Sequence, residues 1–160
     1  MPEGTVNVRE TLNFIGGQFT KGKLGRTFEN LNPADNSLVS RVYEAGKAEV
    51  DAAVSAAKRA LEGEWGKMAP AKRAELLYKV ADRINERFDE FLRAEIADTG
   101  KPVTLASHLD IPRGAANFKI FADTVKNVAG EFFETVTPDG QEAINYAIRR
   151  PKGVVAVICP

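Results

Sequence analysis

The sequence is poor in the two residue types that most often build reactive or metal-binding clusters. It holds one cysteine, Cys159, and one histidine, His108. A single thiol cannot form an internal disulfide, which favours a reducing compartment. One imidazole and one thiol are also too few for the zinc sites that combine several histidines and cysteines. We therefore expect neither a disulfide-stapled secreted domain nor a zinc protein.

An excess of charge of one sign and long hydrophobic runs are also missing. The 22 basic and 22 acidic residues give a formal net charge of zero and are interspersed, so the basic surface of a nucleic-acid or membrane-surface binder is absent. The longest apolar run, Val154 to Cys159, falls far short of the roughly 20 residues that span a bilayer. Met1 to Glu10 lack the apolar core of a signal peptide. The sequence predicts a cytoplasmic protein without nucleic-acid or membrane partners.

Short strands and turns are expected before residue 44. Asn13–Ile15 and Gln18–Thr20 flank the pair Gly16-Gly17, and paired glycines accept the positive φ of a tight hairpin turn. Two edge strands are expected at 26–28 and 38–42, with a turn between them at 32–35.

Helical periodicity begins at Lys47. Apolar residues spaced by three and four predict a helix that ends at Gly63. Pro70 begins a longer helix, predicted to run without a break to Gly100. A third helix is expected from about 106 to 128, kinked or restarted at Pro112. Its predicted inner face comprises Phe118, Phe121, Ala122 and Val125.

Strand patterns return after Gly130. Residues 143–148 alternate in polarity, whereas 154–158 are apolar without alternation, as in a strand buried on both faces of a parallel sheet. Such a strand needs neighbouring strands, so the 160 residues are expected to stop where an α/β domain continues. The fold class predicted from these patterns is α/β.

No complete catalytic site is apparent in the residues. Glycine-rich phosphate-binding loops are absent, and His108 is interpreted as a polar residue at a helix end. Cys159 ends an apolar strand with no neighbouring histidine or lysine to lower its pKa, and buried thiols of this kind are usually inert. The chain is therefore expected to contain no catalytic residue.

Arg113 is the one residue whose setting suggests ligand binding. It follows Pro112 and precedes Gly114 and two alanines, which leave room for a guanidinium to bind a carboxylate through its planar fork. The alternative is a salt bridge to Asp110 or another surface acid. Spacing alone favours the salt bridge.

Three motifs, in this order, resemble the N-terminal third of the aldehyde dehydrogenase superfamily. They are Asn-Pro-Ala at 32–34, Asp-Thr-Gly-Lys-Pro at 98–102, and the segment 149–160. The resemblance covers the chain from about Leu12 onwards. The stretch 105–119 is similar to the 2-hydroxymuconate and 2-aminomuconate semialdehyde dehydrogenases of aromatic-ring degradation.

The resemblance implies an enzyme that oxidises a carboxylate-bearing semialdehyde to a dicarboxylic acid with NAD. In this family a cysteine thiolate forms a thiohemiacetal and then a thioester, which a glutamate-activated water hydrolyses. Both residues are expected outside these 160. In the subfamily, the arginine at the position of Arg113 binds the substrate carboxylate, which reverses the preference for a salt bridge. The 2-hydroxy or 2-amino substrate, and NAD or NADP, stay open.

The resemblance also implies a domain organisation. Residues 1–135 would belong to the Rossmann-type NAD-binding domain, 136–152 to a strand of the oligomerisation arm of a homodimer or homotetramer, and 153–160 to the first central strand of the nucleotide-binding sheet. The cofactor would lie near Ile158, Cys159 and Pro160. A structural monovalent cation, or instead a helix-end hydrogen bond, is expected at Asn30, Leu31 and Asp98.

Two alternatives remain at this stage. The first is a dehydrogenase for a neutral or betaine-type aldehyde, against which Arg113 argues because a fixed cation repels a quaternary ammonium group. The second is a complete, non-catalytic interaction module whose strand at 143–148 pairs with a partner sheet. That module would leave residues 154–160 as an uncovered apolar strand.

Overall fold

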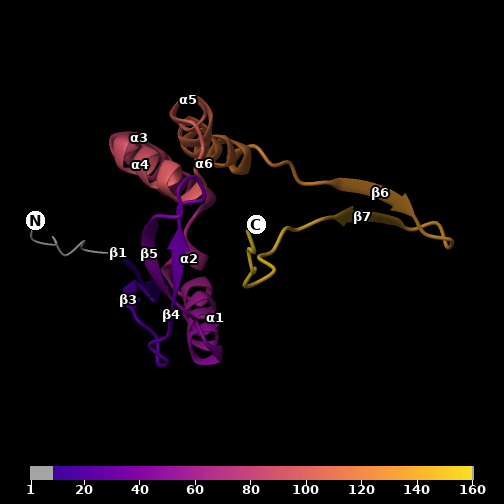
Figure 1. Ribbon diagram of the computed structural model, residues 1–160. Coiled ribbons are helices and arrows are strands. Elements are labelled where there is room, and N and C mark those ends of the chain that lie inside the picture. The colour runs from indigo at the N-terminus through magenta and orange to yellow at the C-terminus, as the bar shows by residue number, and fades with distance from the viewer. Residues whose placement is uncertain (1–8, 160) are drawn as a thin grey trace, which may run out of the picture.

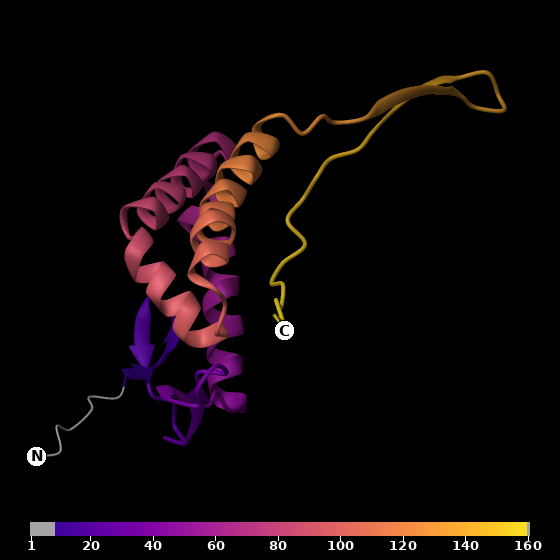
Figure 2. The same ribbon diagram turned by 45° about the horizontal axis from the view of Figure 1, so that its top comes forward.

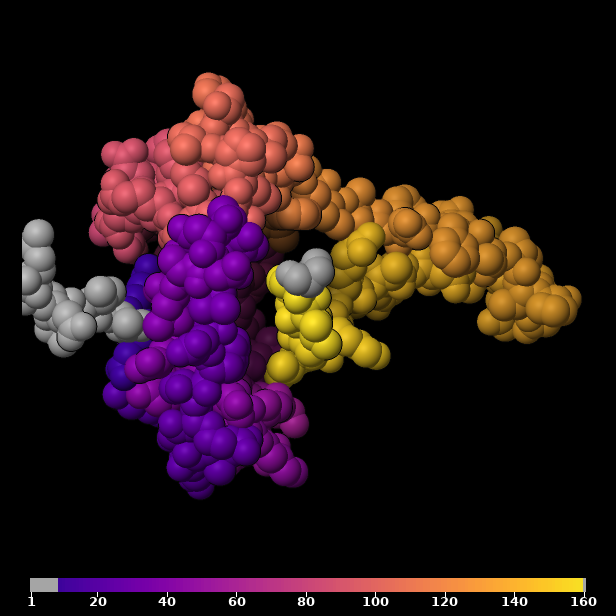
Figure 3. Space-filling view, in the orientation of Figure 1, coloured from indigo at the N-terminus to yellow at the C-terminus, as the bar shows by residue number. Residues whose placement is uncertain are grey.

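The computed structural model describes residues 9–159, which form a body of strands and helices and a hairpin that extends away from it (Figures 1 and 2). In the space-filling view the hairpin is a narrow extension from the body (Figure 3). The mixed α/β class predicted from the sequence is confirmed.

Five short strands precede the helices, as β1 (Arg9–Thr11), β2 (Asn13–Ile15), β3 (Gln18–Thr20), β4 (Thr27–Leu31) and β5 (Leu38–Tyr43). The predicted hairpin is confirmed, because β2 pairs antiparallel with β3 and Gly16 and Gly17 have φ of 60° and 85°. The two predicted edge strands are also present, as β4 and β5. Strand β1 was not predicted; it pairs parallel to β5 and gives a three-stranded sheet of order β1-β5-β4.

Helix α1 (Lys47–Glu62) ends before Gly63, as predicted. Its N-terminus is held by Glu49, whose carboxylate accepts hydrogen bonds from the backbone N–H groups of Lys23 and Gly46, both at 2.9 Å. These hydrogen bonds lower the pKa of Glu49, and the one from Lys23 contributes most. The short helix α2 (Glu64–Lys67) follows.

The prediction of a single helix from Pro70 to Gly100 is wrong, because the chain forms two helices there. They are α3 (Pro70–Glu86) and α4 (Phe88–Thr99). Arg87, between them, has φ −105° and ψ 25°, outside the helical region. The break has a packing reason, since the two halves face different partners. Helix α3 packs along α6, whereas α4 faces β1 and β5 across a hollow of about 800 Å³.

The third predicted helical region comprises α5 (Val103–Leu105), a five-residue π-helix η1 (Ala106–Asp110) and α6 (Ile111–Lys126). Pro112 lies in the first turn of α6, so the predicted restart is confirmed. The π-helix was not predicted.

The predicted inner face of α6 is only partly correct. Ala122 is fully buried, but Phe118, Phe121 and Val125 are exposed. Helices α3 and α6 pack through small side chains, which leaves the larger ones outside the contact. The buried residues of the two helices are Ala74, Ala81, Ala115 and Ala122, with Ile111 as the one large exception. Phe121 and Val125 instead line an apolar groove beside Trp65 and Leu77.

Strands β6 (Phe132–Val136) and β7 (Glu142–Tyr146) form the antiparallel hairpin. Strand β7 overlaps the strand predicted at 143–148, whereas β6 was not predicted. The buried strand expected at 154–158 is not formed, since residues 147–159 carry no regular structure and Ile158 is 92% exposed. A parallel strand is held by neighbouring strands, and within residues 9–159 none is paired with this segment. The division into domains stays a prediction.

We expect Gly100→Ala to destabilise the full-length protein by about 1–2 kcal/mol, because Gly100 ends α4 with φ 67° and a side chain is strained in that conformation. An added Cβ would also lie 3.1 Å from Pro33 Cγ. Urea unfolding measures the effect. The matched control is Gly114→Ala, inside α6, where a Cβ meets nothing within 4 Å. Equal stability changes for the two variants would contradict this account.

Candidate functional site

The first turn of α6 carries Arg113, the predicted substrate-binding residue. Arg113 is exposed and follows the last residue of the π-helix, Asp110, by three positions. The alternative salt bridge to Asp110 is not formed, because Asp110 Oδ2 lies 3.0 Å from Lys101 Nζ. Within residues 9–159, no ion pair involves Arg113. Its guanidinium is therefore available to an external anion.

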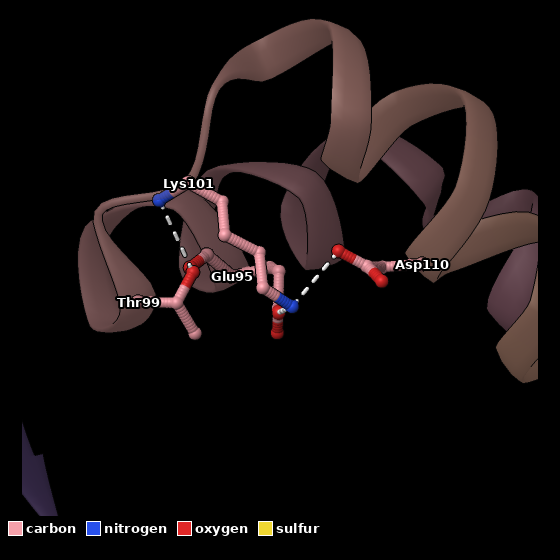
Figure 4. Close-up of polar contacts among 4 residues, drawn as sticks. All are labelled: Glu95, Thr99, Lys101 and Asp110. Carbon is pink, nitrogen blue, oxygen red and sulfur yellow. Dashed lines mark hydrogen bonds and ion pairs between the residues drawn. The ribbon is translucent and has the colours of Figure 1, made fainter.

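Lys101 joins the end of α4 to the end of η1 (Figure 4). Its ammonium group lies 3.0 Å from Glu95 Oε1 and 3.0 Å from Asp110 Oδ2. The exposed fractions of the three side chains are 38% for Lys101, 29% for Glu95 and 24% for Asp110. Hydrogen bonds to Glu95 and then to Asp110 raise the pKa of Lys101, so this lysine is charged at neutral pH.

Thr99 completes this cluster on the backbone side. Its hydroxyl donates to the carbonyl oxygen of Glu95 at 2.7 Å and accepts a hydrogen bond from the N–H of Lys101 at 3.4 Å. In the sequence, Lys101 stands out only as part of the Asp-Thr-Gly-Lys-Pro motif. Its partners are six and nine positions away, spacings that no single helix would bring together, so no periodic pattern signals the cluster.

Two of the three residues named for the predicted cation site are in contact. Asn30 Nδ2 donates to Asp98 Oδ1 at 2.5 Å and so joins β4 to α4. Leu31 is the next residue of β4, where the register with β5 shifts. The amide nitrogen of Asn30, rather than its oxygen, faces the carboxylate, which is the hydrogen bond expected as the alternative to a cation. The cation itself stays a prediction.

The predicted cofactor end is not assembled. Ile158 and Cys159 are exposed in a segment without strand or helix, and Pro160 lies outside the described residues. Cys159 is therefore not the buried thiol that the sequence suggested. The contact of this segment with NAD stays a prediction.

His108 is exposed on η1, with Nδ1 2.9 Å from the carbonyl oxygen of Thr104, as expected of a polar residue in a helix. Within residues 9–159, no group of three or more His, Cys, Asp or Glu side chains could hold a metal ion. None of the described helices is long and apolar enough to cross a membrane.

The hairpin has an extended apolar surface. Phe132, Val136, Ile144 and Tyr146 are each about 70% exposed. No described residue outside β6 and β7 covers them to any large extent, so the hairpin carries a row of uncovered apolar side chains.

Comparison with known proteins places this arrangement in a family. Residues 19–160 match the aldehyde dehydrogenase family. The chain is 63% identical over 153 residues to the 2-hydroxymuconic semialdehyde dehydrogenase of Pseudomonas sp. (strain CF600), covering 96% of this chain and 32% of that protein. It is 44% identical to the 2-aminomuconic 6-semialdehyde dehydrogenase of Pseudomonas sp., covering 96% and 31%.

A solved structure agrees. The NAD+ complex of an aldehyde dehydrogenase from Bacillus cereus superposes with a TM-score of 0.75 and 38% identity, over 78% of this chain and 26% of that one. The chain spans about a third of the length of the curated relatives it matches.

Proposed function

The chain belongs to the aldehyde dehydrogenase family, and we propose that it is the N-terminal part of an NAD-dependent semialdehyde dehydrogenase. The proposed reaction is oxidation of 2-hydroxymuconic semialdehyde to the corresponding dicarboxylic acid. The 2-hydroxy substrate is favoured over the 2-amino one because identity to the enzyme named for it is 63%, against 44%.

The observation that carries the proposal is the unpaired Arg113 on the first turn of α6. An exposed guanidinium with no ion pair among the described residues can bind a carboxylate through two parallel hydrogen bonds. The semialdehyde named for the relatives carries a carboxylate at the end opposite its aldehyde. Arg113 would therefore hold the non-reacting end of the substrate and orient the aldehyde.

The rest of the catalytic apparatus is assigned to the part of the relatives' length that this chain does not span. A cysteine thiolate would attack the aldehyde there, and a glutamate would activate the hydrolytic water. NAD, when bound, supplies the hydride acceptor. The role proposed for the present residues is binding and orientation of the substrate.

Two further roles belong to the same proposal. The β6–β7 hairpin would act as an arm between subunits of a homodimer or homotetramer, which would cover its apolar side chains. Asn30, Leu31 and Asp98 would lie at a monovalent cation site that supports the contact between β4 and α4. Neither role affects the assignment of Arg113.

The test is substrate preference in the full-length enzyme. NADH formation would be followed with 2-hydroxymuconic semialdehyde, hexanal and betaine aldehyde under identical conditions. We expect kcat/KM for the semialdehyde to exceed that for hexanal by about tenfold or more, equivalent to about 1.4 kcal/mol of transition-state binding. Equal or higher values with hexanal or betaine aldehyde would replace this proposal by the neutral or betaine-type alternative.

A further inference from the structure

We propose that Lys101 is a specificity-determining residue for this substrate because it keeps the carboxylate of Asp110 away from Arg113. The inference rests on the proposed function, since it assumes that Arg113 binds the substrate carboxylate. Lys101 would touch neither substrate nor cofactor. It would act through Asp110, as a positioning residue.

Asp110 lies close to Arg113 along the helix. Asp110 has helical backbone angles, φ −68° and ψ −52°, and immediately precedes α6. Residues three apart on a helix are neighbours on its surface, and Asp–Arg pairs at this spacing attract one another. Without a competing partner, Asp110 would thus be placed to pair with Arg113.

Lys101 is the partner of Asp110 in the structure. The Lys101 ammonium lies 3.0 Å from Asp110 Oδ2, and both side chains are partly buried (Figure 4). A contact between partly buried charges is screened less by solvent than a pair on the open surface. Lys101 is also paired with Glu95, at 3.0 Å, so its ammonium group is held by two carboxylates.

The backbone that carries Asp110 is the end of the π-helix. The first residue of the π-helix, Ala106, is fully buried, and Ile111, which follows its last residue, is 8% exposed. Isolated π-turns are rare and occur often at functional sites. Ala106 and Ile111 are buried on one side of this segment and Lys101 pairs with Asp110 on the other, so within residues 9–159 Arg113 has no carboxylate partner.

The experiment compares Lys101→Met with the double variant Lys101→Met/Asp110→Asn in the full-length enzyme. In Lys101→Met the freed Asp110 pairs with Arg113, so KM for 2-hydroxymuconic semialdehyde should rise about tenfold while kcat/KM for hexanal stays within about twofold. In the double variant the competing charge is gone, and KM should return to within about threefold of the wild-type value. Asp110→Asn alone should be close to wild type.

The matched control is Lys119→Met. Lys119 lies on α6 and, like Lys101, joins two helices through a carboxylate, that of Asp82 at 3.1 Å. Its loss should leave the preference between the two substrates unchanged. Circular dichroism checks that each variant folds. If Lys101→Met does not fold, Lys101→Gln, which keeps a donor between the two acids, carries the test with an expected KM increase of about threefold.

Several outcomes would overturn the inference. They are an unchanged KM in the Lys101 variants, an equal loss with hexanal, or a double variant as impaired as the single one. Arg113→Ala separates this failure from that of the proposed function. If Arg113→Ala weakens semialdehyde binding and the Lys101 variants do not, only the role of Lys101 is wrong. If Arg113→Ala has no effect, the carboxylate site itself is wrong.

Discussion

Arg113→Ala in the full-length enzyme is expected to lower kcat/KM for 2-hydroxymuconic semialdehyde by about ten- to a hundredfold. A hydrogen bond to a charged group contributes about 1.5–3 kcal/mol, and about 1.4 kcal/mol corresponds to a tenfold change. The loss should appear mainly in KM, because the guanidinium would hold the substrate end that does not react. Initial rates of NADH formation over a range of substrate concentrations measure both constants.

Two comparisons make this result specific. Hexanal has no carboxylate, so its kcat/KM should be the same in Arg113→Ala and in the wild type. Arg113→Lys keeps the charge but not the planar fork. Its kcat/KM for the semialdehyde should therefore lie between the values of Arg113→Ala and the wild type. A parallel loss with hexanal would mean that Arg113 supports the helix rather than the substrate, and the carboxylate assignment would be abandoned.

Ala122→Leu is expected to lower the free energy of unfolding by about 1–3 kcal/mol, the usual cost of overpacking a close-packed core. Ala122 is fully buried on α6, and the other buried residues of α3 and α6 are mostly alanines. Small side chains let two helices approach closely, so three extra carbon atoms would push the helices apart. Urea unfolding followed by circular dichroism gives the value.

The control for this substitution lies on the same helix. Ala116 is exposed, so Ala116→Leu adds the same atoms without entering the contact between α3 and α6. Its stability should stay within about 0.5 kcal/mol of the wild type. A similar loss in both variants would show that the effect comes from α6 itself and not from its packing.

The parts of the fold that could be predicted depend on local chemistry. Gly16 and Gly17 fix the turn of the β2–β3 hairpin, Gly63 follows the last residue of α1, and Pro112 fixes the restart at α6. Each of these depends on the φ range or the hydrogen-bonding capacity of one or two residues. Such preferences act without reference to distant parts of the chain.

The predictions that were wrong concern features set by contacts between distant segments of the chain. The helix breaks at Arg87 because α3 packs along α6, whereas α4 faces β1 and β5 across the hollow. Neither contact can be recognised from the 3.6-residue period of the sequence. Phe121 and Val125 were assigned to the inner face because they are apolar. The structure instead uses Ala115 and Ala122 for close contact and leaves the larger side chains on a groove.

The same limit applies to the candidate site. Arg113 was identified from its motif and from small neighbours, and those are features of adjacent residues. Whether Arg113 is free depends on the partner of Asp110, which lies nine positions back at Lys101. That pairing requires the turn at Gly100 and the π-helix together, so only the folded chain reveals it.

The π-helix also makes this segment sensitive to insertions and deletions. A π-turn contains one residue more than an α-turn, so loss of one residue from 106–110 would leave an ordinary helical turn. The segment before the deletion would then be rotated by about 100° relative to α6, and the side chains that face each other across the turn would no longer meet. A homologue one residue shorter there could keep its arginine and still lose the lysine–aspartate contact. Inheritance of carboxylate recognition would thus depend on the length of this turn as well as on the residue that binds.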